Sequence, residues 1–79
     1  MSRTPDAVYE GYGIFIVDVQ QDDGRWLATS EVEKHGADGT ETWQHFGGPC
    51  YGRTSDEARI ATLADTRQKI DDVLALPPA

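Results

Sequence analysis

Two Asp-Gly pairs, Asp23-Gly24 and Asp38-Gly39, restrict the fold of this chain more than any other feature of its sequence. Both residue types tolerate the positive φ angles that a two-residue hairpin turn demands. The turns separate three runs rich in β-branched and aromatic residues, at positions 8–20, 25–34 and 40–46. Such runs are typical of strands. The pattern therefore predicts an antiparallel meander of three strands.

The last third of the chain has a helical period instead. Thr54 and Glu57 match a capping box, in which each side chain satisfies a backbone N–H of the other residue. Pro77 and Pro78 end the pattern, because proline cannot continue a helix. The residues at three and four spacing that predict the buried stripe are Ile60, Leu63, Arg67, Ile70 and Leu74. The expected fold class is α+β, a β-β-β-α chain whose single helix packs on one sheet face.

The chain has 79 residues, which is the size of one small domain. We expect a flexible arm over residues 1–7, a single domain over 8–76 and a tail over 77–79. Cys50 is the only cysteine, so no internal disulfide framework is available, and a reducing cytoplasm is the expected location. The sequence also shows no secretory leader and no apolar run of the roughly 18 residues that a membrane span needs.

Charge narrows the range of partners. Fourteen acidic residues against seven basic ones give a net charge of −7. Such a field repels phosphate backbones and anionic lipid headgroups, since nucleic-acid affinity comes largely from neutralised phosphates. We therefore expect no direct nucleic-acid partner and no membrane partner.

The stretch FGGPCYGRT (46–54) is one substitution short of the phosphate-binding pattern GxxxxGK[ST], with Arg53 in place of the lysine. The helix start that follows already carries its own anions, Asp56 and Glu57, and Pro49 removes one N–H group from any phosphate cradle. Phosphate loops of this kind also belong to parallel βαβ units. We interpret the glycines as the conformational freedom that turns a strand into a helix.

No other group of residues predicts chemistry. Cys50 has His45 as its nearest histidine, with no orienting partner that the sequence can place. His35, His45 and Cys50 match none of the strong metal-binding spacings. We expect neither an enzyme nor a bound cofactor or metal.

The first strand has more apolar residues than one helix can cover. Its alternation puts Ile14 and Ile16 on one face and Phe15, Val17 and Val19 on the other. A cluster of such residues on an uncovered face is typical of an interface. The residues that we expect in this interface are Phe15, Val17, Val19, Leu27 and Trp43.

The layout of a meander followed by a helix resembles the double-stranded RNA-binding domain, with TSDEARIATLA (54–64) where that family opens its final helix. That family uses lysines there to hold phosphates, whereas this chain offers Asp56, Glu57 and Arg59, and it has no room for a first helix before Tyr9. The resemblance implies a shared fold without RNA binding.

The chain also resembles small proteobacterial domains of unknown function. The matching segments are YEGYGI (9–14), GRWLATSEV (24–32), the loop at 47–52 and SDEA (55–58). This resemblance spans roughly residues 9–72 and implies no activity.

The sequence thus favours a cytoplasmic protein-interaction or self-association domain, including a homodimer, that uses the uncovered sheet face. The alternative is an acidic regulator that mimics nucleic acid and binds a basic partner protein. This alternative requires a spaced stripe of acidic residues that includes Asp18, Glu31, Glu33 and Glu41.

Overall fold

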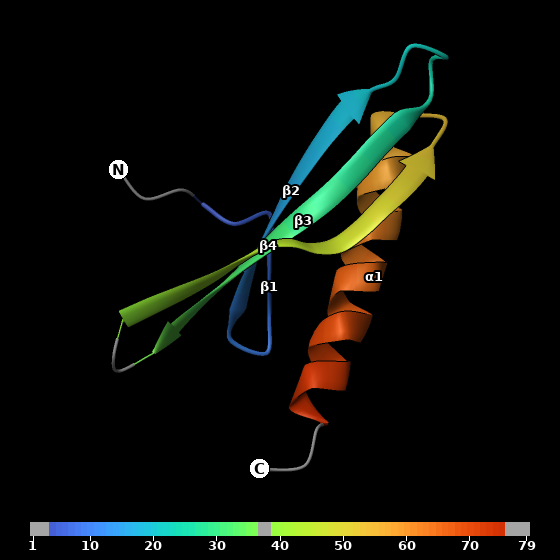
Figure 1. The fold of residues 1–79 in the computed structure, drawn as a ribbon. Helices are drawn as coiled ribbons and strands as arrows, with labels where there is room; N and C mark the ends of the chain where they lie inside the picture. Colours follow the sequence, from blue (N-terminus) through green and yellow to red (C-terminus); the bar gives the residue numbers. More distant parts are fainter. Residues whose placement is uncertain (1–3, 37–38, 76–79) are drawn as a thin grey trace.

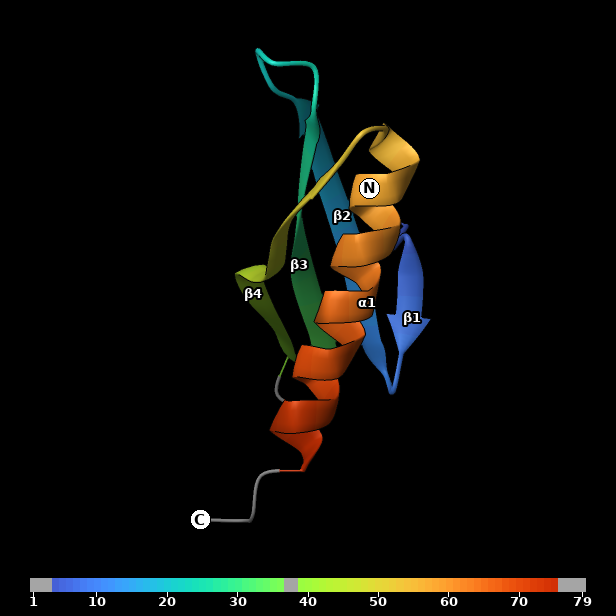
Figure 2. The ribbon, with the colours of Figure 1, turned by 90° about the vertical axis from the view of Figure 1, so that its right-hand side faces the viewer.

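The computed structural model describes residues 4–36 and 39–75. These residues form four strands and one helix, in the order β1 (Ala7–Tyr9), β2 (Tyr12–Gln20), β3 (Trp26–Gly36), β4 (Gly39–Gly52) and α1 (Ser55–Leu74). The strands make one antiparallel sheet in the order β1-β2-β3-β4, and α1 crosses one face of it (Figures 1 and 2). The α+β class is confirmed, but the prediction of three strands is wrong.

The additional strand β1 arises from a tight turn inside the first predicted run. Glu10 and Gly11 both have positive φ, at 53° and 84°, so β1 folds back and pairs with Tyr12–Ile14 of β2. The chain before β1 is attached to the sheet as well. The backbone N–H of Asp6 donates to the Ile14 carbonyl at 2.8 Å, which differs from the expectation of a loose arm over residues 1–7. Residues 1–3 of that arm and the tail at 77–79 lie outside the described residues.

The core lies between the sheet and α1. Its fully packed members are Tyr12, Ile14, Val32 and Ile70, from β2, β3 and the helix. Partly buried side chains pack around this cluster: Ala7, Tyr9, Ile16, Trp43, Phe46 and Leu63. The core draws on every element, which is how a chain of this size closes two layers on each other.

The helix starts as expected but presents a different face. Thr54 is the N-cap, and its hydroxyl accepts from the Glu57 backbone N–H at 3.1 Å. The buried stripe, however, consists of Ala58, Thr62, Thr66 and Ile70. Ile60 is 69% exposed and Leu74 is 50% exposed, so the predicted stripe is wrong except for Ile70 and the partly buried Leu63.

Small side chains with hydroxyl groups, and not large apolar ones, occupy part of the interface between the sheet and α1. Thr66 Oγ1 donates to the Thr62 carbonyl at 2.7 Å, which leaves Ser30 Oγ to donate to Thr66 Oγ1 at 2.6 Å. Ser30 Oγ in turn accepts from the Gly47 N–H at 2.9 Å, and Thr62 Oγ1 donates to the Ala28 carbonyl at 3.0 Å. The three buried hydroxyls of Ser30, Thr62 and Thr66 each have a partner, so these polar groups cost little when they leave water.

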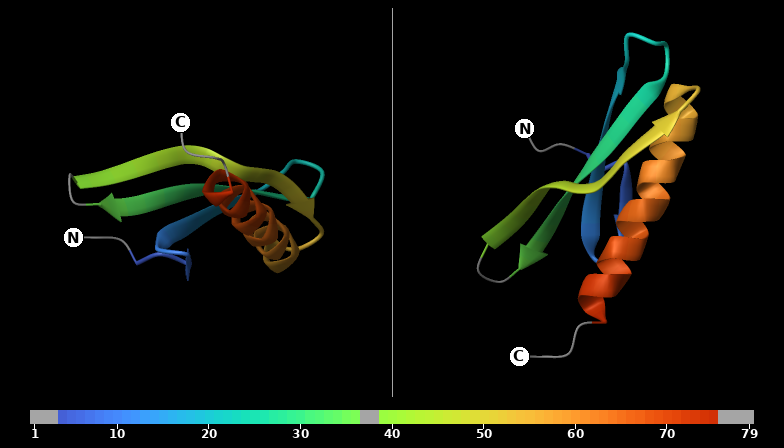
Figure 3. Two further views of the ribbon diagram at one scale, coloured as in Figure 1. Left: turned by 90° about the horizontal axis from the view of Figure 1, so that it is seen from below. Right: turned by 45° about the vertical axis from the view of Figure 1, so that its right-hand side comes forward.

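Strand β4 is longer than the part of β3 that it pairs with. The partners run Ala28↔Cys50, Ser30↔Gly47 and Val32↔Trp43, so β4 inserts extra residues at two places. His45 takes a positive φ of 53° within one of these bulges. Bulges bend a strand and change its twist. The far part of the β3–β4 hairpin extends away from α1 (Figure 3).

Candidate functional site

Within the described part of the chain, no helix covers the face of the sheet opposite α1. Side chains alternate along a strand, and directly paired residues of antiparallel strands point to the same side. Ile14, Val32 and Trp43 are paired across β2, β3 and β4 and pack in the helix-side core, so their neighbours in the alternation point away from it. We call this surface the open face; its members are Val8, Phe15, Val17, Val19, Leu27, Thr29, Glu31, Glu33 and Tyr51.

Apolar side chains on the open face are unusually exposed. Val8 is 68% exposed, Val17 55%, Val19 54% and Tyr51 53%. Among the described residues, these are all of the exposed large hydrophobic side chains that the strands contribute. Val19, Leu27 and Tyr51 form one row across β2, β3 and β4, with Val17 one pleat further along β2.

Four of the five predicted interface residues lie on this face, and they differ in exposure. Val17 and Val19 are exposed and Leu27 is half-buried, whereas Phe15 is only 5% exposed. Phe15 also takes part in a further contact within the chain. Other parts of the chain therefore cover Phe15, and it offers little surface to a partner.

Trp43, the fifth predicted residue, lies on the other side of the sheet. Its ring stands 5.5 Å from that of Tyr12 and 5.6 Å from that of Phe46, measured between centroids, and it packs against the helix-side core. The prediction of its face is wrong because the register of β4 shifts by the inserted residues. Tyr51, which the sequence reading missed, takes a place on the open face opposite Leu27. Its position directly after Gly48-Pro49-Cys50 gave no signal of its face.

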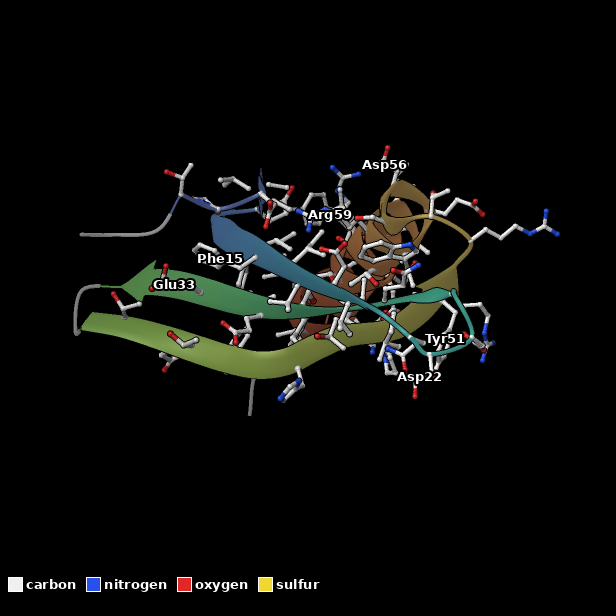
Figure 4. The ribbon with its side chains drawn as sticks, turned by 90° about the horizontal axis from the view of Figure 1, so that it is seen from above. Phe15, Asp22, Glu33, Tyr51, Asp56 and Arg59 are labelled. Atoms are coloured by element: carbon white, nitrogen blue, oxygen red, sulfur yellow. The ribbon has the colours of Figure 1, made fainter. Side chains whose placement is uncertain are left out.

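Different charged groups lie at the two ends of the open face. Glu31 and Glu33 follow each other on β3, toward the end where the β3–β4 hairpin extends. The opposite end carries Tyr51, with the Arg25 guanidinium 4.8 Å from the centre of its ring. Figure 4 shows Phe15 and Glu33 toward one end of the sheet and Tyr51 toward the other.

The cation at the Tyr51 end is already neutralised by an ion pair. Arg25 Nε lies 2.7 Å from Asp23 Oδ2, and the Arg25 backbone N–H donates to Asp23 Oδ1 at 3.0 Å. The backbone donor first, and then the guanidinium, lower the pKa of the Asp23 carboxyl from its ordinary value. Glu31 and Glu33, on the same face, each take part in a further interaction within the chain.

A second charged cluster, on the helix side of the sheet, joins α1 to the edge of β2. Arg59 of α1 pairs with Asp6 Oδ1 at 2.7 Å and with Asp18 Oδ1 at 2.8 Å, and it donates to the Ile16 carbonyl at 3.3 Å. Asp6 Oδ2 accepts from the Ile16 N–H at 2.7 Å. Asp6 and Arg59 thus bind the backbone of β2 at Ile16, just beyond the stretch that β1 covers, and protect this edge from pairing with another strand.

The acidic residues named for nucleic-acid mimicry do not share one stripe. Asp18 lies within the Arg59 cluster, where a hydrogen bond from Ser55 first, and then Arg59, lower the pKa of its carboxyl. Glu41 of β4 stands opposite Lys34 of β3 in the strand register, on the helix side. Only Glu31 and Glu33 lie together on the open face.

The glycine-rich stretch resembling a phosphate loop has its donors in use. The Gly47 N–H binds Ser30 Oγ, and the Gly48 N–H donates to Asp65 Oδ2 at 2.7 Å. Cys50 is half-buried opposite Ala28, and His45 is exposed in the β4 bulge. Within residues 4–36 and 39–75, no three metal-binding side chains come together, and α1 is not apolar enough to cross a membrane.

Comparison of the chain with protein-family models, with curated proteins and with solved structures finds no match. Candidate function therefore depends on the geometry of the open face.

Proposed function

We propose that the protein is an interaction domain that binds another protein molecule through the open face. The observation that carries this proposal is the concentration of exposed apolar side chains there: Val8, Val17, Val19 and Tyr51 are each more than half exposed. Burying apolar surface contributes roughly 25 cal/mol per Å². Val19 and Tyr51 lie in one row with Leu27 between them, and Val17 is the next residue of that face along β2. Such a cluster of exposed apolar side chains is typical of a binding surface.

The distribution of residues between the two layers supports the same proposal. The interface between sheet and helix contains Ser30, Thr62 and Thr66, although larger apolar side chains are available in the same elements. Val17 and Val19 stay outside in β2, and Ile60 stays outside in α1. A sheet face whose only task was solvation would carry polar residues at the valine positions.

Site-specific photo-crosslinking in cells that express the protein natively tests this proposal. A benzophenone amino acid replaces Val17, Val19 or Ile60, one position at a time, and adducts are identified by mass spectrometry. Ile60 is the matched control because it is an exposed β-branched residue, 69% accessible, on the helix side of the molecule. We expect discrete adducts from positions 17 and 19, either with another protein or with a second copy of the chain.

Equal adduct formation from position 60 would contradict the proposal, as would the absence of adducts from both valine positions. Circular dichroism of each labelled variant confirms that the fold is retained. The substitutions are at exposed sites, so loss of folding is not expected.

A further inference from the structure

The segment at residues 4–9, which includes β1, contributes no fully buried residue to the fold; we call it the strap. β1 is the outermost strand of the sheet and has three residues (Figure 2). The packed core takes its members from β2, β3 and α1, and the strap adds only the partly buried Ala7 and Tyr9 to its margin. Val8, between them, is exposed. Segments with few buried apolar contacts open at a lower free energy than the fold as a whole.

Polar contacts at two places along α1 hold the strap. Toward the start of the helix, Arg59 pairs with Asp6 Oδ1 at 2.7 Å, and Asp6 Oδ2 accepts from the Ile16 N–H at 2.7 Å. Toward the end of the helix, the Tyr9 hydroxyl donates to Asp71 Oδ1 at 2.7 Å. These contacts are exposed, so water competes for them and salt weakens the ion pair. They can therefore break while the core stays packed.

The turn between the strap and β2 favours opening as well. Glu10 in this turn has a φ of 53°, a backbone conformation that side chains other than glycine rarely adopt, and opening releases it. Arg59 keeps a second partner when the strap leaves, because its guanidinium also lies 2.8 Å from Asp18 Oδ1. The cation that Asp6 needs for closing is therefore held in place by the rest of the fold.

We infer that the strap opens and closes as one unit over the edge of β2 while the rest of the fold stays intact. In the closed form, the Ile14 carbonyl accepts from the Asp6 N–H and the Ile16 N–H donates to the Asp6 side chain. In the open form, these two backbone groups are released and can pair with another strand. The strap is thus a gate over this edge. The inference goes beyond the proposed function, because it concerns the backbone of β2 and not the side chains of the open face.

Hydrogen exchange of the full ¹⁵N-labelled chain, followed amide by amide, tests the inference. The reporters are the N–H groups of Asp6 and Ile16, whose hydrogen bonds close with the strap. Asp71→Ala removes the acceptor of the Tyr9 hydroxyl, at the other end of the strap. If the strap opens as a unit, this change should speed exchange at both reporters about threefold, because it removes a hydrogen bond to a charged group. Exchange at the buried Val32 should stay slower than at either reporter.

Asp72→Ala is the matched control for Asp71→Ala. Asp72 is the next residue of α1, is also exposed, and accepts from Gln68 on the same helix at 3.2 Å. Its loss removes the same charge and should leave exchange at both reporters nearly unchanged. Raising the NaCl concentration from about 0.1 M to about 1 M should speed both reporters, because salt screens the ion pair between Asp6 and Arg59. The amide spectrum of each variant shows that the fold is kept.

Equal effects of Asp71→Ala and Asp72→Ala on the reporters would overturn the inference, because the two ends of the strap would then move independently. An acceleration at Val32 as large as that at the reporters would also overturn it, since the strap would then open only when the whole chain unfolds. Tyr9→Phe deletes the same hydrogen bond from the strap side and keeps the ring. It should reproduce the effect of Asp71→Ala at both reporters, and a variant that leaves Ile16 unchanged would count against the strap as a unit.

Discussion

Gly47→Ala should destabilise the protein strongly, because the helix packs directly against this glycine. A Cβ at position 47 would stand 2.1 Å from Thr66 Oγ1, 2.6 Å from Ser30 Oγ and 3.1 Å from Thr66 Cβ. Ordinary contacts between heavy atoms lie near 3.5 Å or beyond. Since Gly47 does not have a positive φ, the effect is steric and owes nothing to backbone conformation.

The free energy of unfolding should fall by at least about 3 kcal/mol. Overpacking a closed core costs about 1–3 kcal/mol. The added methyl also pushes apart Ser30 Oγ and Thr66 Oγ1, which are 2.6 Å apart, and displaces the Gly47 N–H from Ser30 Oγ. Each lost hydrogen bond adds about 1 kcal/mol. A domain of this size has a total stability of roughly 5 kcal/mol or slightly more, so the loss is a large part of it.

Urea unfolding, followed by tryptophan fluorescence, measures this loss. With a slope of about 1 kcal/mol/M, the midpoint should move down by about 3 M. Thr66→Ala in the same chain removes the closest of these atoms, Thr66 Oγ1, and frees Ser30 Oγ to move, so the double variant should be more stable than the sum of the two single changes predicts. Gly13→Ala is the control, because its Cβ would meet Pro5 at an ordinary 3.4 Å. A Gly47→Ala midpoint equal to that of Gly13→Ala, or strict additivity with Thr66→Ala, would refute the reasoning.

Three further predictions concern the anchoring of the sheet and the core. The folded-state pKa of Asp18 lies below its ordinary value of about 3.9, so its ionisation stabilises the fold above that value, and this contribution is lost as pH falls through the lower, folded pKa. Asp18→Asn should therefore narrow the difference between the unfolding free energies at pH 7 and pH 3, and an unchanged difference would count against this account. Arg59→Ala should speed amide hydrogen exchange at Ile16, because the Ile16 N–H donates to Asp6, whose carboxylate pairs with Arg59, whereas exchange at the buried Val32 should not change. Trp43→Ala should lower the free energy of unfolding by about 3 kcal/mol without changing binding at the open face, and a selective loss of binding would show that its helix-side placement is wrong.

Local signals in the sequence predicted the elements well where the chemistry is short-range. The Asp23-Gly24 turn joins β2 to β3, and Thr54 caps α1, because both depend on a few neighbouring residues. The β1 hairpin was missed although Glu10-Gly11 forms a tight turn. Glutamate at positive φ is uncommon, so the pair gave no turn signal comparable to Asp-Gly.

Long-range packing decided the features that sequence periodicity could not predict. The helix buries Thr62 and Thr66 in place of Ile60 because threonine hydroxyls find acceptors in the Ala28 and Thr62 carbonyls. A hydropathy pattern does not show that these hydrogen bonds offset the cost of burying a hydroxyl group. Likewise, the face of Trp43 depends on how many residues β4 inserts, which is a property of the pairing. The valines of β2 were placed correctly because strict alternation needs no knowledge of a partner strand.

The close approach of α1 to β4 explains why apolar residues remain on the open face. Gly47 and the small buried side chains of α1 let the helix lie close to the sheet, but they contribute less apolar burial than leucine or isoleucine would. The monomer therefore has a modest hydrophobic contribution to its stability while Val17, Val19 and Tyr51 stay in water. A partner that binds only the folded state stabilises it by mass action, by about 2.7 kcal/mol at a hundredfold excess over its dissociation constant. Binding at the open face should thus raise the melting temperature by several degrees, and the gain should disappear in Val17→Ser with Val19→Ser while it persists in Ile60→Ser.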